Sequence, residues 1–292
     1  MSLFLQSLID GLLIGGVYAT IAIGLSLAFG VMRMINWAHG ELLMLSMYLS
    51  FYIISATSLN PYLVLFVTGT VMFFVGYFLQ KAAFNRLLAK ESTREPISIL
   101  LFTSGLGMVL SNGILILCGS TTMQAKTVYT GQTLKLESLI ISVPKLISFG
   151  IAVTVALGLY IVLQKTEVGR AIRATSQNRA VAKLMGINEN RIYCISFGIS
   201  IMLVGISGAL LMPYFSVYPT VGQVFSFKSF IIVVLGGKGS VIGALLGGLI
   251  VGVVEKVGAQ YLSESYAQIL VFLLFIGILL FKPTGLLSKE KD

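Results

Sequence analysis

The sequence predicts an all-α bundle of transmembrane helices, with about eight to ten crossings of the membrane. Three observations predict it. Of the 292 residues, 57% are hydrophobic and only 11% are charged, whereas soluble domains carry about 25% charged residues. The charged residues stand in short runs between uncharged stretches, which are long enough for spans of roughly 20 residues each. The lysines and arginines gather in loops that fall on one predicted side of the membrane.

Nine segments are candidates for these crossings. We expect spans at residues 5–30, 34–55, 62–80, 97–117, 146–164, 192–212, 223–236, 241–259 and 266–282. The segment 223–236 is too short to cross an untilted bilayer, which predicts a broken or partial helix. Such irregular backbone is tolerated at membrane depth only where it is buried or lines a cavity. We expect one transmembrane domain over residues 1–292.

The loop charges predict the orientation. The loops 81–95 and 165–191 are rich in lysine and arginine, which places both in the cytoplasm. By parity, the region 119–145 and the N-terminus lie outside and the C-terminal tail lies inside. The first 16 residues contain no lysine or arginine. A cleavable signal peptide needs a positive start, so we expect the first span to begin there.

The composition also bears on other classes of function. The net charge is +9, but the basic residues are confined to loops, which favours membrane orientation over a nucleic-acid surface. We therefore expect membrane lipid as a partner and no nucleic acid. The two cysteines adjoin apolar segments and are expected to be small buried residues. The single histidine, His39, is too few for a metal site. We expect no metal, no cofactor and no catalytic residue.

The loop at about 165–191 is basic and has helical periodicity. Asn178 is a candidate N-cap for a short helix over 179–185. Gly186 then supplies a left-handed C-cap, with Ile187 folding back on the last turn. The apolar residues of this short helix are Val181, Leu184 and Met185. The loop either rests on lipid headgroups or docks into a groove of a cytosolic partner.

Ionisable residues cluster where the first span ends. Arg33, His39 and Glu41 lie there, and ionisable groups near membrane depth mark functional sites. We expect Glu41 to pair with Arg33 or His39, and Asn36 to complete a polar network. Two interpretations remain open: a helix break whose freed backbone groups need polar partners, or a contact for a transported substrate.

A glycine-rich stretch, residues 236–240, occurs late in the chain. It lacks the frame of a phosphate-binding loop, and we expect a tight turn with Lys238 at the cytoplasmic surface. The next helix has glycines at four-residue spacing, which indicates close packing in the bundle or a dimer seam; they are Gly243, Gly247, Gly248 and Gly252. A further set of charged residues borders apolar segments and is expected to reach the interface on long stems: Asp10, Lys228, Glu255 and Lys256.

Three of these stretches resemble one family, the permeases of branched-chain amino-acid ABC importers. They are Gly169–Ala174 followed by Asn178, Ala182 and Gly186–Asn188; Met34–Leu42, with its Asn-Trp-Ala-His-Gly-Glu sequence; and Val234–Gly243. The resemblance covers essentially the whole chain in order. Because no further spans precede the first motif, the sequence is similar to the LivH-type subunit rather than to its longer LivM-type partner.

The resemblance implies partners and a mechanism. Permeases of this family pair with a second, LivM-like permease and two cytoplasmic ATP-binding subunits, and an external substrate-binding protein delivers the amino acid. ATP is then bound by the partner subunits and not by this chain. The implied ATPase-coupling residues are Gly169, Arg170, Arg173, Ala174, Asn178, Ala182, Gly186 and Ile187. The implied translocation path or gate contains Asn36, His39, Gly40, Glu41, Gly236, Gly237, Gly239 and Ser240.

Other functions are open at this point. The same family includes permeases for urea and other small solutes. An ion-coupled secondary transporter would need an ionisable group at membrane depth, for which Asp10, Glu41 and Glu255 are the candidates. An intramembrane enzyme would need histidines for a metal or a serine nucleophile paired with His39, and no supporting spacing is visible.

Overall fold

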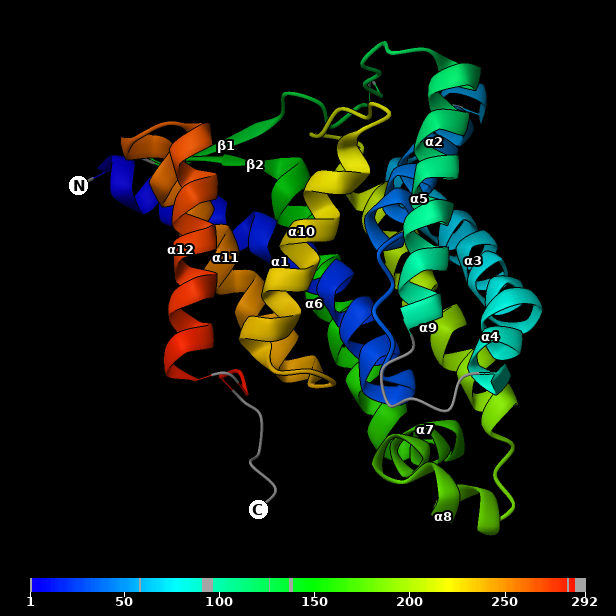
Figure 1. Cartoon of the computed structure of the whole chain (residues 1–292). Helices are drawn as coiled ribbons and strands as arrows, with labels where there is room; N and C mark the ends of the chain where they lie inside the picture. Colours follow the sequence, from blue (N-terminus) through cyan, green and yellow to red (C-terminus); the bar gives the residue numbers. More distant parts are fainter. Residues whose placement is uncertain are drawn as a thin grey trace.

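The chain folds as a bundle of helices with one small β-hairpin, in a computed structural model that describes residues 2–57, 59–90, 97–125, 127–136, 139–282 and 284–286 (Figure 1). The long helices are α1 (Ser2–Met32), α2 (His39–Thr57), α3 (Pro61–Leu79), α5 (Ile97–Cys118), α6 (Val143–Lys165), α9 (Glu189–Leu211), α10 (Val221–Gly236), α11 (Val241–Tyr261) and α12 (Glu264–Phe281). The short elements are the π-helical turn η1 (Gln80–Phe84), α4 (Asn85–Lys90), α7 (Glu167–Gln177), α8 (Arg179–Leu184), β1 (Thr133–Leu136) and β2 (Leu139–Ser142). The two strands pair antiparallel, with Thr133 opposite Ser142.

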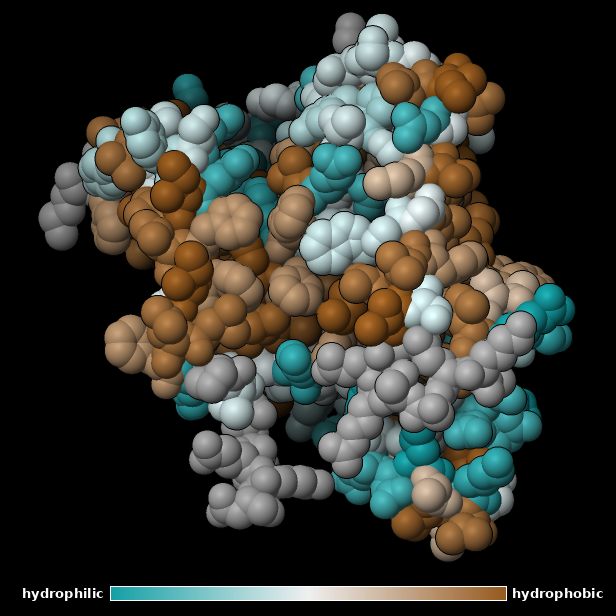
Figure 2. Space-filling view, viewed as in Figure 1, coloured by the Kyte–Doolittle hydropathy of each residue, from teal (hydrophilic) through white to brown (hydrophobic). Residues whose placement is uncertain are grey.

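The predicted spans are confirmed. Within the described residues, eight helices are long and apolar enough to cross a membrane, and α10 is a shorter apolar helix. Hydrophobic residues form a band across the molecule, with hydrophilic residues gathered above and below it (Figure 2). The chain is therefore a multi-pass membrane protein.

The two ends of the bundle agree with the predicted sidedness. The N-terminus of α1 lies at the same end as β1 and β2, and α7 and α8 lie at the opposite end (Figure 1). Since α7 and α8 carry the basic loop, the loop charges predict that their end is the cytoplasmic one. Residues 91–96 of the other basic loop and the basic tail from 287 onward lie outside the described residues.

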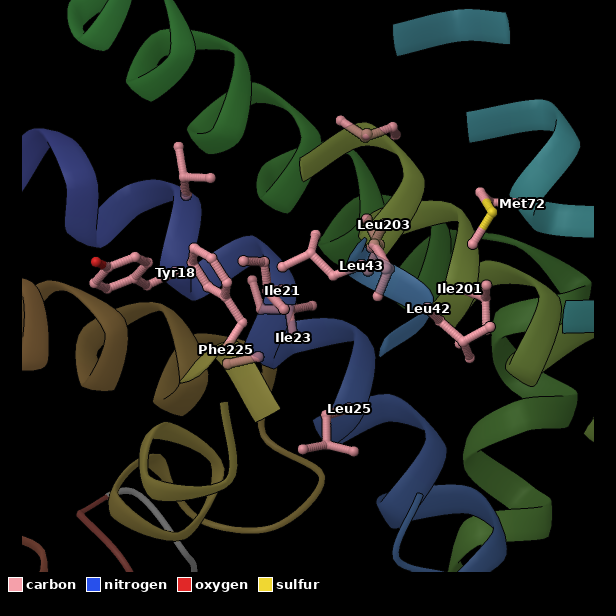
Figure 3. Close-up of a cluster of buried hydrophobic side chains, with 14 of the residues drawn as sticks. Tyr18, Ile21, Ile23, Leu25, Leu42, Leu43, Met72, Ile201, Leu203 and Phe225 are labelled. Atoms are coloured by element: carbon pink, nitrogen blue, oxygen red, sulfur yellow. The ribbon is translucent and has the colours of Figure 1, made fainter. Parts of the chain in front are cut away.

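Helices α1 and α9 form the centre of the bundle, and nearly all of their residues are buried. An apolar cluster lies between α1, α2, α3, α9 and α10, and Tyr18 and Phe225 lie at one side of it (Figure 3). The hydroxyl of Tyr18 points away from this cluster. By contrast, α5 and α12 are mostly exposed, as expected of helices that face lipid or a partner.

The glycines of α11 pack inside the chain. A Cβ on Gly248 would lie 2.6 Å from Ala19 Cα, and one on Gly15 would lie 2.8 Å from the Gly248 carbonyl oxygen. On another face of α11, a Cβ on Gly247 would lie 2.9 Å from the Ile232 carbonyl oxygen. The four-residue spacing therefore serves close contacts with α1 and α10. Both glycine faces are occupied within the chain, so the dimer-seam interpretation is wrong.

Candidate translocation and coupling sites

The chain reverses direction after α1 through a segment that is not helical. Helix α1 ends at Met32, Arg33 adopts a left-handed conformation with φ of 52°, and α2 begins at His39. A non-glycine residue in this conformation is uncommon and ends a helix. The Asn36 side chain then accepts a hydrogen bond from the Ala38 amide at 3.2 Å. The expected helix break is confirmed, and Asn36 stabilises its turn.

Polar groups of three helices meet at this break. His39 is 1% exposed, and its Nε2 donates to the Ile21 carbonyl oxygen of α1 at 3.0 Å. The Gly40 amide donates to Ser226 Oγ of α10 at 2.9 Å. Ser226 Oγ in turn donates to Glu41 Oε2 at 3.3 Å. Freed backbone groups and a buried carboxylate are thus satisfied by neighbouring helices, as membrane depth requires.

The expectation that Glu41 pairs with Arg33 or His39 is wrong. Arg33 is exposed and His39 is bonded to the Ile21 carbonyl. Within the described part of the chain, Glu41 makes no ion pair. Arg33 lies at the end of α1, whereas α2 begins only after the extended turn, which separates the two charges. The sequence could not indicate Ser226 as the partner, because it stands 185 residues away.

A cavity of about 350 Å³ opens beside this network. Its polar lining includes Glu41, Ser104, Ser111, Asn112, Gln223 and Ser226. The Trp37 ring stands at its edge, 5.7 Å from the Phe227 ring in an edge-to-face arrangement. The Trp37 amide donates to Thr103 Oγ1 of α5 at 3.2 Å. The cavity opens at the surface of the bundle, since its lining residues Met108 and Phe227 are exposed. A hollow with these polar groups beside apolar helices is suited to a path for a small polar solute.

The glycine stretch forms the turn between α10 and α11. Gly237 and Gly239 have φ of 96° and 82°, which only glycine adopts readily. Ser240 caps α11 by accepting a hydrogen bond from the Gly243 amide at 3.0 Å. The predicted tight turn is confirmed, and Lys238 lies 4.9 Å from the Phe29 ring near the end of α1.

The structure does not bring this turn to the N-terminal motif. Ser226, which bonds to Gly40 and Glu41, precedes Gly236 by ten residues of α10, or roughly 15 Å along a helix. The turn instead shares a cavity of about 360 Å³ with the cytoplasmic helix α7, where Gly239 and Ser240 lie across from Arg173 and Ser176. The predicted gate set therefore divides into two places, one in the membrane and one at the cytoplasmic end.

The cytoplasmic loop folds into two short helices joined at Asn178. Thr166 caps α7 by accepting from the Gly169 amide at 3.0 Å, and Asn178 caps α8 by accepting from the Val181 amide at 3.2 Å. After α8, Gly186 has φ of 81° and its amide donates to the Lys183 carbonyl. The Ile187 amide donates to the Ala182 carbonyl. These bonds form a Schellman motif, so both predicted caps are confirmed.

The two cytoplasmic helices hold the end of α1. Ser176 Oγ of α7 donates to the Gly30 carbonyl oxygen at 2.7 Å, and Arg179 Nη2 of α8 donates to the Met32 carbonyl oxygen at 2.8 Å. The last carbonyls of a helix lack partners within the helix, and a cation is favoured at this negative end of the helix dipole. The loop and α1 are therefore joined by two side-chain bonds. Sequence reasoning did not identify Ser176, since a serine in a helix carries no distinctive signal.

The outer face of α8 is apolar and exposed. Leu184 is 86% exposed and Met185 is 77% exposed, and Val181 is half exposed. Ala182, on the other side, is buried. Of the remaining predicted coupling residues, Arg170 forms an exposed ion pair with Glu167 at 3.6 Å, and Ala174 accepts the Asn178 amide at the end of α7.

Two charged residues do not lie where they were expected. Lys228 and Glu255 do not extend to the interface; they form an ion pair at 2.8 Å inside the bundle, with side chains only 13% and 14% exposed. Asp10 pairs with Lys145 at 3.1 Å near the outer end. Within the described residues, no group of three His, Cys, Asp or Glu side chains could hold a metal ion.

Comparison with known proteins places the chain in a family. A family model described as branched-chain amino acid transport system / permease component matches residues 7–279. The chain is 32% identical to the branched-chain amino acid permease BraD of Pseudomonas aeruginosa, over 99% of this chain and 97% of that protein. It is also 32% identical to LivH of Escherichia coli, over 99% and 96%. A probable LivH of Methanocaldococcus jannaschii is 27% identical over 92% and 88%.

No solved structure matches the chain. The family match nevertheless covers nearly the whole length, and the bundle, the broken helix after α1 and the capped cytoplasmic helices all lie within it. The chain belongs to the family of branched-chain amino acid transport system permease components.

Proposed function

We propose that this chain is the permease subunit of an ATP-driven importer that carries leucine, isoleucine and valine across the cytoplasmic membrane. The substrate class rests on the relatives, which are named as branched-chain amino acid permeases. The working assembly contains a second homologous permease, two cytoplasmic ATP-binding subunits and an external binding protein. This chain moves the solute, and its partners bind and hydrolyse ATP.

One observation carries the coupling role: α7 and α8 are bonded to the last turn of α1 through Ser176 and Arg179. Helix α1 runs through the centre of the bundle, and its Ile21 carbonyl is bonded to His39 at the start of α2. A displacement of α7 and α8 therefore reaches the polar network beside the membrane cavity through one continuous helix. Packed elements of this kind move as units between discrete states.

The exposed face of α8 supports a protein partner for the loop. Leu184 and Met185 are among the most exposed apolar side chains of the described residues. An apolar helix face in a solvated loop is suited to docking in a groove. We assign this groove to an ATP-binding subunit, whose closure on ATP would push on α7 and α8 and favour one state of the permease.

The test is purification of the tagged chain in mild detergent, followed by reconstitution. We expect a second permease and two ATP-binding subunits in comparable amounts. With the binding protein added, proteoliposomes are expected to accumulate labelled leucine only when ATP is present on the cytoplasmic side. Recovery of the chain alone, with uptake driven by an ion gradient, would refute the proposal. If the proteoliposomes take up urea and not leucine, the chain is still an importer permease, but the proposed substrate is wrong.

A further inference from the structure

A polar cluster that the proposed coupling route does not use lies inside the bundle where α1, α10 and α11 meet. Lys228 Nζ of α10 lies 2.8 Å from both carboxylate oxygens of Glu255 of α11. Tyr18 of α1 donates from its hydroxyl to Glu255 Oε1 at 3.2 Å and accepts from Lys228 at 3.1 Å. The ammonium group also lies 4.7 Å from the centre of the Tyr18 ring. The Tyr18 hydroxyl is the group that points away from the apolar cluster (Figure 3).

The cluster is at membrane depth. Lys228 follows the first residue of α10 by seven positions and precedes the last by eight, so it lies about 10 to 12 Å from either end of the helix. Ionisable side chains at this depth are rare and line functional paths. A buried ion pair also contributes little to stability, because apolar residues of similar size often stabilise a core equally well or better. Stability alone therefore does not explain the pair.

A cavity of about 200 Å³ borders the pair. A cavity of this size has room for several water molecules or for a small amino acid. The polar residues that line it are Lys228, Glu255, Gln223 and Gln268. Its apolar wall consists of Val224, Phe227, Ile231, Val271 and Phe272. The cation, the anion and the aromatic wall match the α-carboxylate, the α-ammonium and the side chain of a zwitterionic apolar amino acid, respectively.

We propose that this cavity is a transient binding site for the zwitterionic amino acid during its passage through the permease, an inference that rests on the proposed function. Lys228 binds the α-carboxylate, Glu255 binds the α-ammonium, and the side chain packs on Phe227 and Phe272. The pair opens to admit the substrate and closes again when it leaves. Each buried charge therefore has an opposite partner in both states, which avoids the penalty of an unpaired charge at membrane depth.

The site connects to the polar cavity beside the helix break. Gln223 and Phe227 of α10 line both cavities. A strip of α10 therefore leads from Glu41 and Ser226 to Lys228 and Glu255. Because the protein pair competes with the substrate for the same charges, binding is weak and reversible. Weak binding is what passage requires, since a solute held tightly would not leave.

The test uses the complete complex in proteoliposomes with its binding protein. Photoreactive leucine, which carries a diazirine in its side chain, is cross-linked during turnover, and the labelled peptides are identified by mass spectrometry. We expect label on the cavity-lining residues of α10 and α12. The variants Glu255→Gln and Lys228→Met should each lose leucine uptake and this label by about tenfold or more, the effect of one charge-assisted hydrogen bond. The control variant Asp10→Asn breaks the ion pair with Lys145 near the outer end. It should retain both leucine uptake and the label.

A triple variant separates binding from folding. Lys228→Met with Glu255→Met is made together with Tyr18→Phe, because the buried Tyr18 hydroxyl bonds to both charged residues and would otherwise lose its partners. The cluster is then apolar throughout, so the variant should fold and assemble as well as the wild type and still lose uptake. Normal uptake by this triple variant, or label confined to helices other than those lining the cavity, would overturn the site. If the wild-type complex shows no ATP-dependent leucine uptake at all, the proposed function fails. If the wild-type complex takes up leucine and the variants at Lys228 and Glu255 take it up equally well, only this inference is refuted.

Discussion

The bond between Arg179 and the end of α1 is predicted to transmit ATP-driven motion, and Arg179→Met removes it. The guanidinium donates to the Met32 carbonyl oxygen at 2.8 Å and lies 5.1 Å from the Tyr193 ring. Methionine keeps the unbranched stem and loses the charge and the donor. The short helix α8 retains its Asn178 cap and its Schellman motif, so the loop should still fold.

The magnitude follows from the bond that is lost. A hydrogen bond from a charged donor contributes about 1.5 to 3 kcal/mol. The residue is exposed at the cytoplasmic surface, where water competes, so the lower end applies. The favourable position of a cation at a helix C-terminus adds about 0.3 to 1 kcal/mol. A total near 2 kcal/mol corresponds to about 30-fold in an equilibrium constant. We expect leucine uptake per ATP hydrolysed to fall by about 10- to 30-fold.

The assay measures uptake and ATP hydrolysis in the same proteoliposomes. Lys183→Met is the matched control, because it removes one positive charge from the same helix. Among the described residues, the Lys183 side chain makes no hydrogen bond or ion pair. The control variant should show the same leucine uptake per ATP hydrolysed as the wild type. If Arg179→Met and Lys183→Met give the same leucine uptake per ATP hydrolysed, the bond from Arg179 to the end of α1 does not transmit the motion. The proposed coupling route would then be wrong.

Three further predictions concern packing, the loop and the helix break. Gly248→Leu drives a side chain into the backbone of α1 and should lower the melting temperature of the purified chain by several degrees, since overpacking costs about 1 to 3 kcal/mol or more; Gly277→Leu, at a position with open space, should leave it unchanged. Gly186→Val forces a β-branched residue into a left-handed conformation, and uptake should fall while membrane insertion, measured by fractionation, is retained. Ser226→Ala leaves the Gly40 amide without its acceptor and should reduce uptake severalfold at equal expression, whereas equal uptake would remove the network from the path.

Much of the fold could be predicted because its signals are local. A span is recognised from about 20 consecutive residues, and a helix cap from neighbours within one turn. Asn178 and Gly186 therefore lie where the sequence predicts them. The partners of buried charges are a different problem. Glu255 stands 27 residues from Lys228, and both come together only because α10 and α11 fold back on each other beside α1.

The same limit explains the division of the predicted gate. The motif around His39 and the turn around Gly239 appear equivalent in sequence, since both join glycine to polar residues. Their depth depends on where α1 ends and on the length of α10, which are properties of the assembled bundle. Only the structure separates a membrane network from a cytoplasmic turn that packs against α7.

Helix α1 connects these polar sites, because each site bonds to a different turn of the helix. From the outside inward, its contacting groups are the Tyr18 hydroxyl, the Ile21 carbonyl, the Ser26 hydroxyl, the Gly30 carbonyl and the Met32 carbonyl. They bond in turn to the buried ion pair, to the start of α2, to the α10–α11 turn, and to the two cytoplasmic helices. A continuous helix resists bending, since each turn is held by its own backbone bonds. We therefore propose that a shift imposed by the cytoplasmic helices is delivered to every polar site at once. On the proposed function, opening of the buried ion pair is then part of the same movement that ATP drives.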